Sequence, residues 1–261
     1  MIELSSHEFG SVSSLFDGIE HNVALVHSVI EGNSPGRVFV DRRESPSSAY
    51  LIHEGAFHYV AGDPSNGEFN DAMIAYLFDE VLSGPEAQEL VLFAFSEAWR
   101  QALDALLSPR GAKRIRRKTF AFHPTRFHAH DGWRESLPDG VCVQCIDERL
   151  ANRNPDYTPL LDPRTQRFGA CVAVGDDIAS ACTAVAVGGG EVEIDIHTNE
   201  THRRQGHALR AACAFIEQAQ ARGLRPNWSC WPERDASCAL AGKLGFEDGP
   251  DVPAHFWMTG M

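Results

Sequence analysis

Apolar and polar residues recur with two different periods near the C-terminal end of this chain. Residues 191–198 alternate acidic and apolar side chains, which predicts a strand with one acidic and one apolar face. From Gly206 the apolar positions follow helical spacing as far as residue 219, and Gly223 is placed to end that helix. The pattern therefore predicts a strand, a polar loop and an amphipathic helix in direct succession.

The remaining periodicity predicts the α/β fold class, with an α+β mixed sheet. Helical spacing occurs at residues 15–30, 69–81, 97–107, 147–152 and 236–244. Strands are expected at 37–41, 48–53, 57–61, 89–95, 141–146, 170–174, 178–187 and 227–231, with a terminal pair at 246–247 and 254–258. Residues 155–163 are expected to form a loop.

Composition narrows the class of protein. Hydrophobic residues make up 43% of the 261 residues and charged residues 23%, as in ordinary globular proteins. No apolar run is long enough to cross a bilayer and the first residues do not resemble a signal peptide, so we expect a cytoplasmic protein without a membrane partner. The net charge of −13 argues against nucleic acid as a partner. An acidic surface would suit a cationic substrate, but a negative charge that keeps the protein in solution is an equally good explanation.

The cysteines and histidines were considered as metal ligands. The seven cysteines are expected to be small buried residues rather than a disulfide framework, because their number is odd and the expected compartment is reducing. Cys142 and Cys145 have metal-ligand spacing but no second pair, so no metal is expected there. His123, His128 and His130 are expected to be ordinary surface histidines. The alternative is that they bind the metal of a metal-dependent hydrolase.

Residues 110–118 carry six basic side chains and no acidic one. A run of this kind is typical of a solvated strand face or a linker. The alternative is a guide for an anionic cofactor.

The start of the helix at Gly206 suits an anion. The first turn of a helix has unpaired backbone N–H groups and the positive end of the helix dipole. Gly206 lets a phosphate approach the backbone closely, Ala208 keeps the next turn small, and Arg203 and Arg204 add positive charge. The segment is therefore a candidate diphosphate site.

Two segments carry a resemblance to a known family. Residues 194–208, with Arg203-Arg204-Gln205-Gly206-His207-Ala208, resemble motif A of the GNAT (Gcn5-related N-acetyltransferase) superfamily. Residues 235–246, which end in Leu244-Gly245-Phe246, resemble its motif B. The resemblance implies a GNAT acyltransferase domain at 119–261. It also implies a smaller α/β extension at 1–118, for which a degenerate GNAT-like half is one form.

The implied activity is transfer of an acetyl group from acetyl-CoA to a primary amine of a small molecule, by direct attack on the thioester. The expected oligomeric state is a monomer or a homodimer. The alternative is a non-catalytic acyl-CoA-binding or regulatory protein. The resemblance implies cofactor contacts at Ile196, His197, Thr198, Arg203, Arg204, Gln205, Gly206, His207, Ala208 and Arg234, the last in place of a frequent Asn.

Catalysis requires a base, because an ammonium is not nucleophilic. Glu193 is the candidate, since clustered acids on one strand face can raise the pKa of one carboxyl group. The alternative is that the three acids line a substrate cleft or face water. The usual acid of the family, a Tyr, is replaced by Ala241. Ser237 is the candidate substitute, with Cys238, a water or unassisted departure of the thiolate as alternatives.

Overall fold

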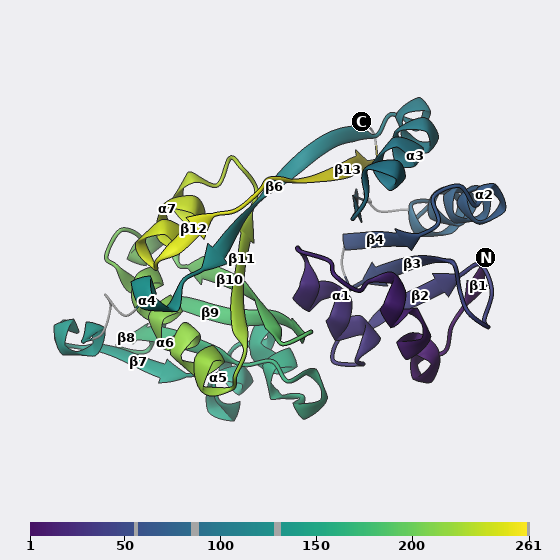
Figure 1. The fold of residues 1–261 in the computed structure, drawn as a ribbon. Helices are drawn as coiled ribbons and strands as arrows, with labels where there is room; N and C mark the ends of the chain where they lie inside the picture. The colour runs from purple at the N-terminus through teal and green to yellow at the C-terminus, as the bar shows by residue number, and fades with distance from the viewer. Residues whose placement is uncertain (55–56, 85–88, 128–131, 260–261) are drawn as a thin grey trace. The chain divides into compact units, whose positions relative to one another are not determined.

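The computed structural model describes residues 1–54, 57–84, 89–127 and 132–259. In these residues thirteen strands form one mixed sheet, in the order β1-β2-β3-β4-β5-β13-β6-β11-β10-β9-β8-β7, with β12 paired to β6 off this path. The chain divides into two compact units: Met1–Arg117 with Val252–Met261, and Lys118–Asp251. The predicted α/β class with a mixed sheet is confirmed (Figure 1).

The first unit has helices on both faces of its strands (Figure 1). One face packs on α2 and α3, around the buried Tyr50, Leu92 and Trp99, while α1 contacts β3. Strand β4 pairs with β5 in parallel, and the other strands of this unit pair antiparallel. Its strands are β1 (Ile2–Glu3), β2 (Gly36–Val40), β3 (Ser48–His53), β4 (Phe57–Gly62), β5 (Glu89–Ala94), β13 (Val252–Met258) and the first half of β6 (Lys113–Phe122). Its helices are η1 (Ser6–Leu15), α1 (Val23–Ile30), α2 (Gly67–Tyr76), η2 (Leu77–Val81), α3 (Glu97–Leu107) and η3 (Ser108–Arg110).

The second unit is built around the longest helix of the described chain, α6. The apolar stripe of α6 packs on β8, β9 and β10, and the ring of Phe215 stacks on that of Phe168 with 4.7 Å between centroids. On β8 and β9, Cys171 and Ala181 pack instead with Leu150 of α5. The strands are β7 (Val141–Cys145), β8 (Gly169–Val174), β9 (Asp177–Gly188), β10 (Glu191–Thr198), β11 (Arg225–Cys230) and β12 (Phe246–Asp248). The helices are α4 (Pro124–Phe127), η5 (Trp133–Ser136), α5 (Glu148–Arg153), η6 (Pro155–Leu161), η7 (Pro163–Thr165), η8 (Glu200–His202), α6 (His207–Ala221) and α7 (Asp235–Lys243).

Three local predictions differ from the structure. The helix expected at 15–30 is divided into η1 and α1, because Gly18 and Asn22 between them adopt positive φ. The loop expected at 155–163 forms the helical turns of η6, whose start is capped by the Asn154 side chain. Both terminal strands are present as β12 and β13, but they do not pair with each other: β12 pairs with the second half of β6, and β13 pairs with its first half and with β5. The ten residues of β6 give each strand a separate partner segment.

Four cysteines are buried as predicted, namely Cys171, Cys182, Cys213 and Cys230. The prediction was wrong for Cys142 and Cys145, which are exposed because β7 ends the strand order and so forms an edge of the sheet. Within the described part of the chain, no helix is both long and apolar enough to span a bilayer.

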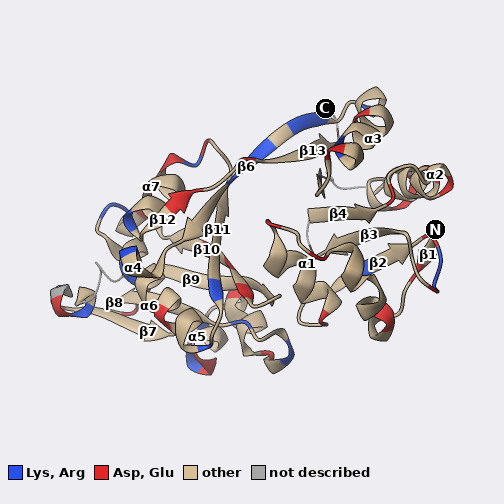
Figure 2. Ribbon diagram, in the orientation of Figure 1, with Lys and Arg blue, Asp and Glu red and all other residues tan. Residues whose placement is uncertain are grey.

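The basic run lies mostly on β6 and is visible as the blue part of that strand (Figure 2). Two of its side chains have partners within the first unit. Arg114 forms an ion pair with Asp104, and the Arg117 guanidinium lies 5.0 Å from the centroid of the Phe57 ring. Lys113, Arg114 and Arg116 are exposed, so this part of β6 is largely a solvated strand face, which is the first of the two expected roles.

Candidate functional site

Strands β10 and β11 part soon after they begin. They pair in parallel only at Glu191–Arg225, Val192–Pro226 and Glu193–Asn227. From Trp228 onward β11 pairs instead with β6, while β10 stays paired with β9 as far as Thr198. Among the described residues, the last five residues of β10 therefore have no ladder partner on the β11 side.

The orientation of the β10 peptide groups follows from one hydrogen bond beyond the strand. The backbone N–H of Asn199 donates to the carbonyl of Ala179, so residue 199 points toward β9. Successive residues of a strand direct their peptide groups to opposite edges. The peptide groups of Ile196 and Thr198 therefore point toward the parted edge, whereas the carbonyl of His197 accepts from the Ser180 hydroxyl at 2.9 Å. Of the three predicted backbone contacts, those of Ile196 and Thr198 have the required direction.

The turn into α6 has an open backbone. Gly206 is the N-cap residue with a φ of 78°, and no side chain caps the helix. Arg204 also has a positive φ, of 62°, so two of the three residues before α6 adopt the left-handed conformation. Because the first turn of α6 has neither an acidic residue nor a side-chain cap, its N–H groups are available to an anion.

Three arginines lie close to this turn. Arg203 and Arg204 are exposed, and Arg203 is 3.3 Å from Glu200 in an exposed ion pair. Arg210 was not among the predicted residues. Its Nη1 donates to the carbonyl of Gln205 at 3.0 Å, and a Cβ on residue 206 would lie 3.0 Å from the same atom. The signal was present in the sequence, since Arg210 is four residues after Gly206 and thus on the same helix face.

His207 differs in environment from its neighbours. Its side chain is 3% exposed and neither ring nitrogen has a hydrogen-bond partner among the described residues. Burial lowers the pKa of His207, and the nearby Arg210 and His202 lower it further. The ring is therefore uncharged at neutral pH. Gln205 is exposed and Ala208 is half-buried.

The Glu193 side chain lies where the strands part. The residue is 2% exposed, and its carboxylate accepts from two neutral groups of β11. Ser229 Oγ donates to Oε1 at 2.5 Å, and Asn227 Nδ2 donates to Oε2. Neither donor was predicted, although both follow from strand alternation: residues 227 and 229 share the face of β11 that is adjacent to Glu193.

The other two acids of the strand are in different environments. Glu191 is buried and forms an ion pair with Arg225 of β11. Asp195 is exposed. The three acids therefore differ, and only Glu193 is both buried and placed at the point of divergence.

Ser237 lies on the opposite face of β11. Its hydroxyl accepts from Nε1 of Trp228 at 3.1 Å, and residues 228 and 229 point to opposite faces. The Sγ atom of Cys238 is 3.3 Å from that of Cys230 on the same side. Ala241 is fully buried in the core, and Arg234 is exposed at the start of α7.

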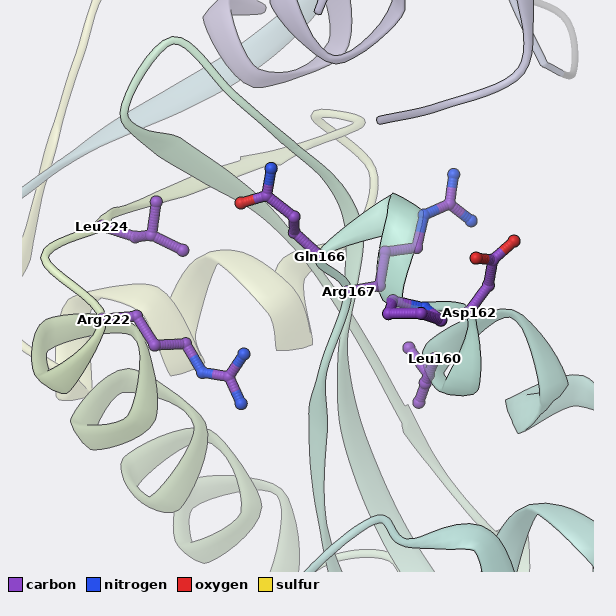
Figure 3. Close-up of a pocket in the computed structure, with 7 residues that line it drawn as sticks. Leu160, Asp162, Gln166, Arg167, Arg222 and Leu224 are labelled. Atoms are coloured by element: carbon purple, nitrogen blue, oxygen red, sulfur yellow. The ribbon is translucent and has the colours of Figure 1, made fainter. Parts of the chain in front are cut away.

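A cavity of about 340 Å³ lies at the other end of α6 (Figure 3). It is lined by Leu160, Asp162, Pro163, Gln166, Arg167, Arg222 and Leu224. Arg222 follows the last residue of α6, so the helix length of about 22 Å separates the cavity from the Gly206 turn. The cavity is therefore not the predicted cofactor site.

The histidines considered as metal ligands are only partly described. His123 Nε2 is 2.8 Å from Oε2 of Glu247 on β12. His128 and His130 lie outside the described residues. In the described ranges, no group of three or more His, Cys, Asp or Glu side chains is arranged to hold a metal ion.

Comparison with known proteins gives one family. A family model described as GNAT acetyltransferase matches residues 13–252. The protein YdfB of Bacillus subtilis, described as an N-acetyltransferase, is 28% identical over 263 residues, which is 97% of this chain and 97% of that protein.

Solved structures have the same fold. A GCN5-related N-acetyltransferase-like protein from Streptococcus suis has a TM-score of 0.69 at 20% identity, over 96% of this chain and 98% of that chain. A tandem GNAT protein from the clavulanic acid biosynthesis pathway has a TM-score of 0.64 at 11% identity, over 100% of this chain and 98% of that chain.

Proposed function

The chain belongs to the GNAT acetyltransferase family and is an N-acetyltransferase, and from that premise we propose that it transfers an acetyl group from acetyl-CoA to a primary amine of a small molecule. One observation carries the proposal: β10 parts from β11 after Glu193 and then leads, through η8, to the open turn at Gly206. The peptide groups of Ile196 and Thr198 would pair with the pantetheine amides. The N–H groups from Arg204 to Ala208 would hold the diphosphate, with Arg203, Arg204 and Arg210 adding charge.

Glu193 is the proposed base. The acceptor amine reaches the enzyme as an ammonium and must lose a proton before its nitrogen attacks the thioester carbonyl. Glu193 supports this role better than Glu191, whose carboxylate is paired with Arg225, and better than Asp195, which is exposed. The N–H groups at the parted edge of β10 would stabilise the oxyanion that forms during attack.

Two residues of α7 bear on the acid that would assist the departing thiolate, namely Ser237 and Ala241. Ser237 lies on the face of β11 opposite Glu193, and its hydroxyl oxygen accepts a hydrogen bond from the Trp228 indole. The buried methyl group of Ala241 offers no proton. This absence favours the second candidate function, an acyl-CoA-binding protein that does not catalyse transfer.

The first unit is proposed to be a degenerate GNAT-like half. Three strands, a helix, a parallel strand and a second helix follow one another in both units, as β2-β3-β4-α2-β5-α3 and as β8-β9-β10-α6-β11-α7. Both helix-connected strand pairs, β4–β5 and β10–β11, are parallel. The repeated order supports a shared architecture.

Calorimetric titration with acetyl-CoA, followed by a thiol-release assay on spermidine, glucosamine and kanamycin, tests the proposal. We expect binding, and turnover of at least one amine. Glu193→Gln should lower kcat by roughly 10²–10⁴-fold, because it removes the base, and leave the Kd of acetyl-CoA unchanged.

Asp195→Asn, a change of the exposed acid on the same strand, is the matched control and should retain wild-type kcat. Absence of acetyl-CoA binding would contradict the cofactor assignment. Binding without turnover of any amine, and no effect of Glu193→Gln, would favour the non-catalytic alternative.

A further inference from the structure

Glu193 is a buried residue of β10. It is 2% exposed, while Ser229, which donates to its Oε1, is only half-buried. Asn227, which donates to Oε2, is also half-buried. Both donors are less buried than Glu193, so each is a candidate for the group that passes a proton from an acceptor amine to the carboxylate.

The two donors differ in what they can do with a proton. A hydroxyl group donates one hydrogen bond and accepts others at the same oxygen, so it can take a proton and release its own. The side-chain nitrogen of Asn227 only donates, and it has no lone pair available for a proton. The 2.5 Å separation of Ser229 Oγ and Glu193 Oε1 is typical of a strong O–H···O⁻ hydrogen bond.

We infer that Ser229 relays the proton of the acceptor amine to Glu193, with Asn227 as a positioning residue that fixes the carboxylate. In this step an N–H bond of the ammonium breaks and its proton forms a bond to Ser229 Oγ. The original hydroxyl proton passes from Ser229 Oγ to Glu193 Oε1. The serine hydroxyl is restored, Glu193 becomes a carboxylic acid, and the neutral amine keeps its electron pair for attack on the thioester.

The position of Ser229 in the fold suits this role. Asn227 is the last residue of β11 that pairs with β10, and Ser229 comes two residues later, opposite Thr119 of β6. The hydroxyl therefore lies within the divergence of the strands, on the face that carries Glu193. The inference rests on the proposed function, since it gives the route by which the proposed base receives its proton.

The test is the pH profile of kcat/KM for Ser229→Ala and Ser229→Thr, with acetyl-CoA and the fastest amine of the panel. Near pH 7 we expect a loss of about 100-fold in Ser229→Ala and near-wild-type activity in Ser229→Thr, which keeps the hydroxyl. The loss should shrink as the pH approaches the pKa of the acceptor amine, because the solvent then removes the proton. Thr119→Val, which deletes the hydroxyl opposite Ser229, should retain the wild-type profile.

Two results separate failure of the relay from failure of the proposed function. The double variant Glu193→Gln with Ser229→Ala should be no slower than Glu193→Gln alone, because the two groups act in one transfer. If Glu193→Gln is slow but Ser229→Ala is not, or if the Ser229→Ala loss is the same at every pH, the relay is wrong and the base stands. If no panel amine is turned over, or Glu193→Gln keeps full activity, both are wrong.

Discussion

The start of α6 in the second unit and the start of α2 in the first have the same place in a repeated order of elements, but only one is open. Gly206 begins α6 without a side-chain cap. At α2 the Asn66 side chain accepts from the N–H of Phe69, and Glu68 places a carboxylate in the first turn. The helix dipole and the N–H groups of α2 are therefore satisfied by the chain itself.

The strand pairs ahead of these helices differ in the same way. Strand β4 pairs with β5 over four of its six residues, from Phe57 to Val60. The fully buried Trp99 of α3 then donates from Nε1 to the carbonyl of Gly62 at 2.8 Å and covers the end of β4. In the second unit β11 turns to β6 after three pairs with β10. The comparison teaches that the common order of elements does not by itself leave a helix start open, and that the proposed cofactor site depends on the uncapped turn and the parted edge of the second unit.

The largest expected effect is on the stability of the first unit, where Trp99 packs at the end of β4. Trp99→Ala should lower the free energy of unfolding by about 3–5 kcal/mol, because it removes a fully buried indole ring and a hydrogen bond. Urea titration measures this loss, and the Kd of acetyl-CoA should stay within about threefold of wild type under folding conditions. Trp257→Ala is the matched control, because this half-buried ring also donates to a backbone carbonyl, that of Arg110. It should lower the free energy of unfolding by less than Trp99→Ala does. Loss of acetyl-CoA binding in a folded Trp99→Ala protein would break the comparison.

The next effect is on the open turn. Gly206→Asp should weaken acetyl-CoA binding by about 100-fold, because it strains a residue at a φ of 78° and places a carboxylate at the anion site. Calorimetric titration measures the Kd. Gly67→Asp makes the same substitution in the first turn of α2, where no atom lies within 4 Å of the new Cβ, and it should leave the Kd unchanged. Equal effects at the two positions would contradict the assignment of the cofactor to α6.

The smallest expected effect is the pH dependence of the free energy of unfolding that His58 of the first unit causes. Burial lowers the pKa of His58 to about 3, so the folded chain keeps this ring neutral while the unfolded chain binds a proton below about pH 6.5. The neutral His58 ring therefore contributes its full stabilisation above pH 6.5, the pKa of histidine in the unfolded chain. This contribution is lost as the pH falls toward the pKa of His58 in the folded chain. Between pH 7.5 and pH 5.5 the free energy of unfolding should fall by about 1.4 kcal/mol on account of His58 alone.

Urea titrations at both pH values measure this slope. His58→Asn keeps an acceptor for the Tyr50 hydroxyl and should remove the His58 contribution, although its overall stability will be lower. An unchanged slope in the variant would show that His58 is not a neutral buried ring in the folded chain.

The sequence predicted the elements that carry the candidate site because each has a local cause. Alternation marked the strand at 191–198, and Gly206 and Gly223 marked the ends of α6. The same alternation placed Glu193 on that strand. The donors Asn227 and Ser229 could not be assigned in advance, since their contact with Glu193 depends on the parallel register of β10 and β11 across more than thirty residues. The pairing of β12 and β13 with different halves of β6 also depends on long-range register rather than on local pattern.

Amide hydrogen exchange with and without acetyl-CoA tests the central claim most directly, because it compares the two regions in one sample. We predict slower exchange in residues 194–198 and 204–208 when acetyl-CoA is present, and no change in residues 57–69. Protection at the start of α2, or none at the turn before α6, would contradict the account.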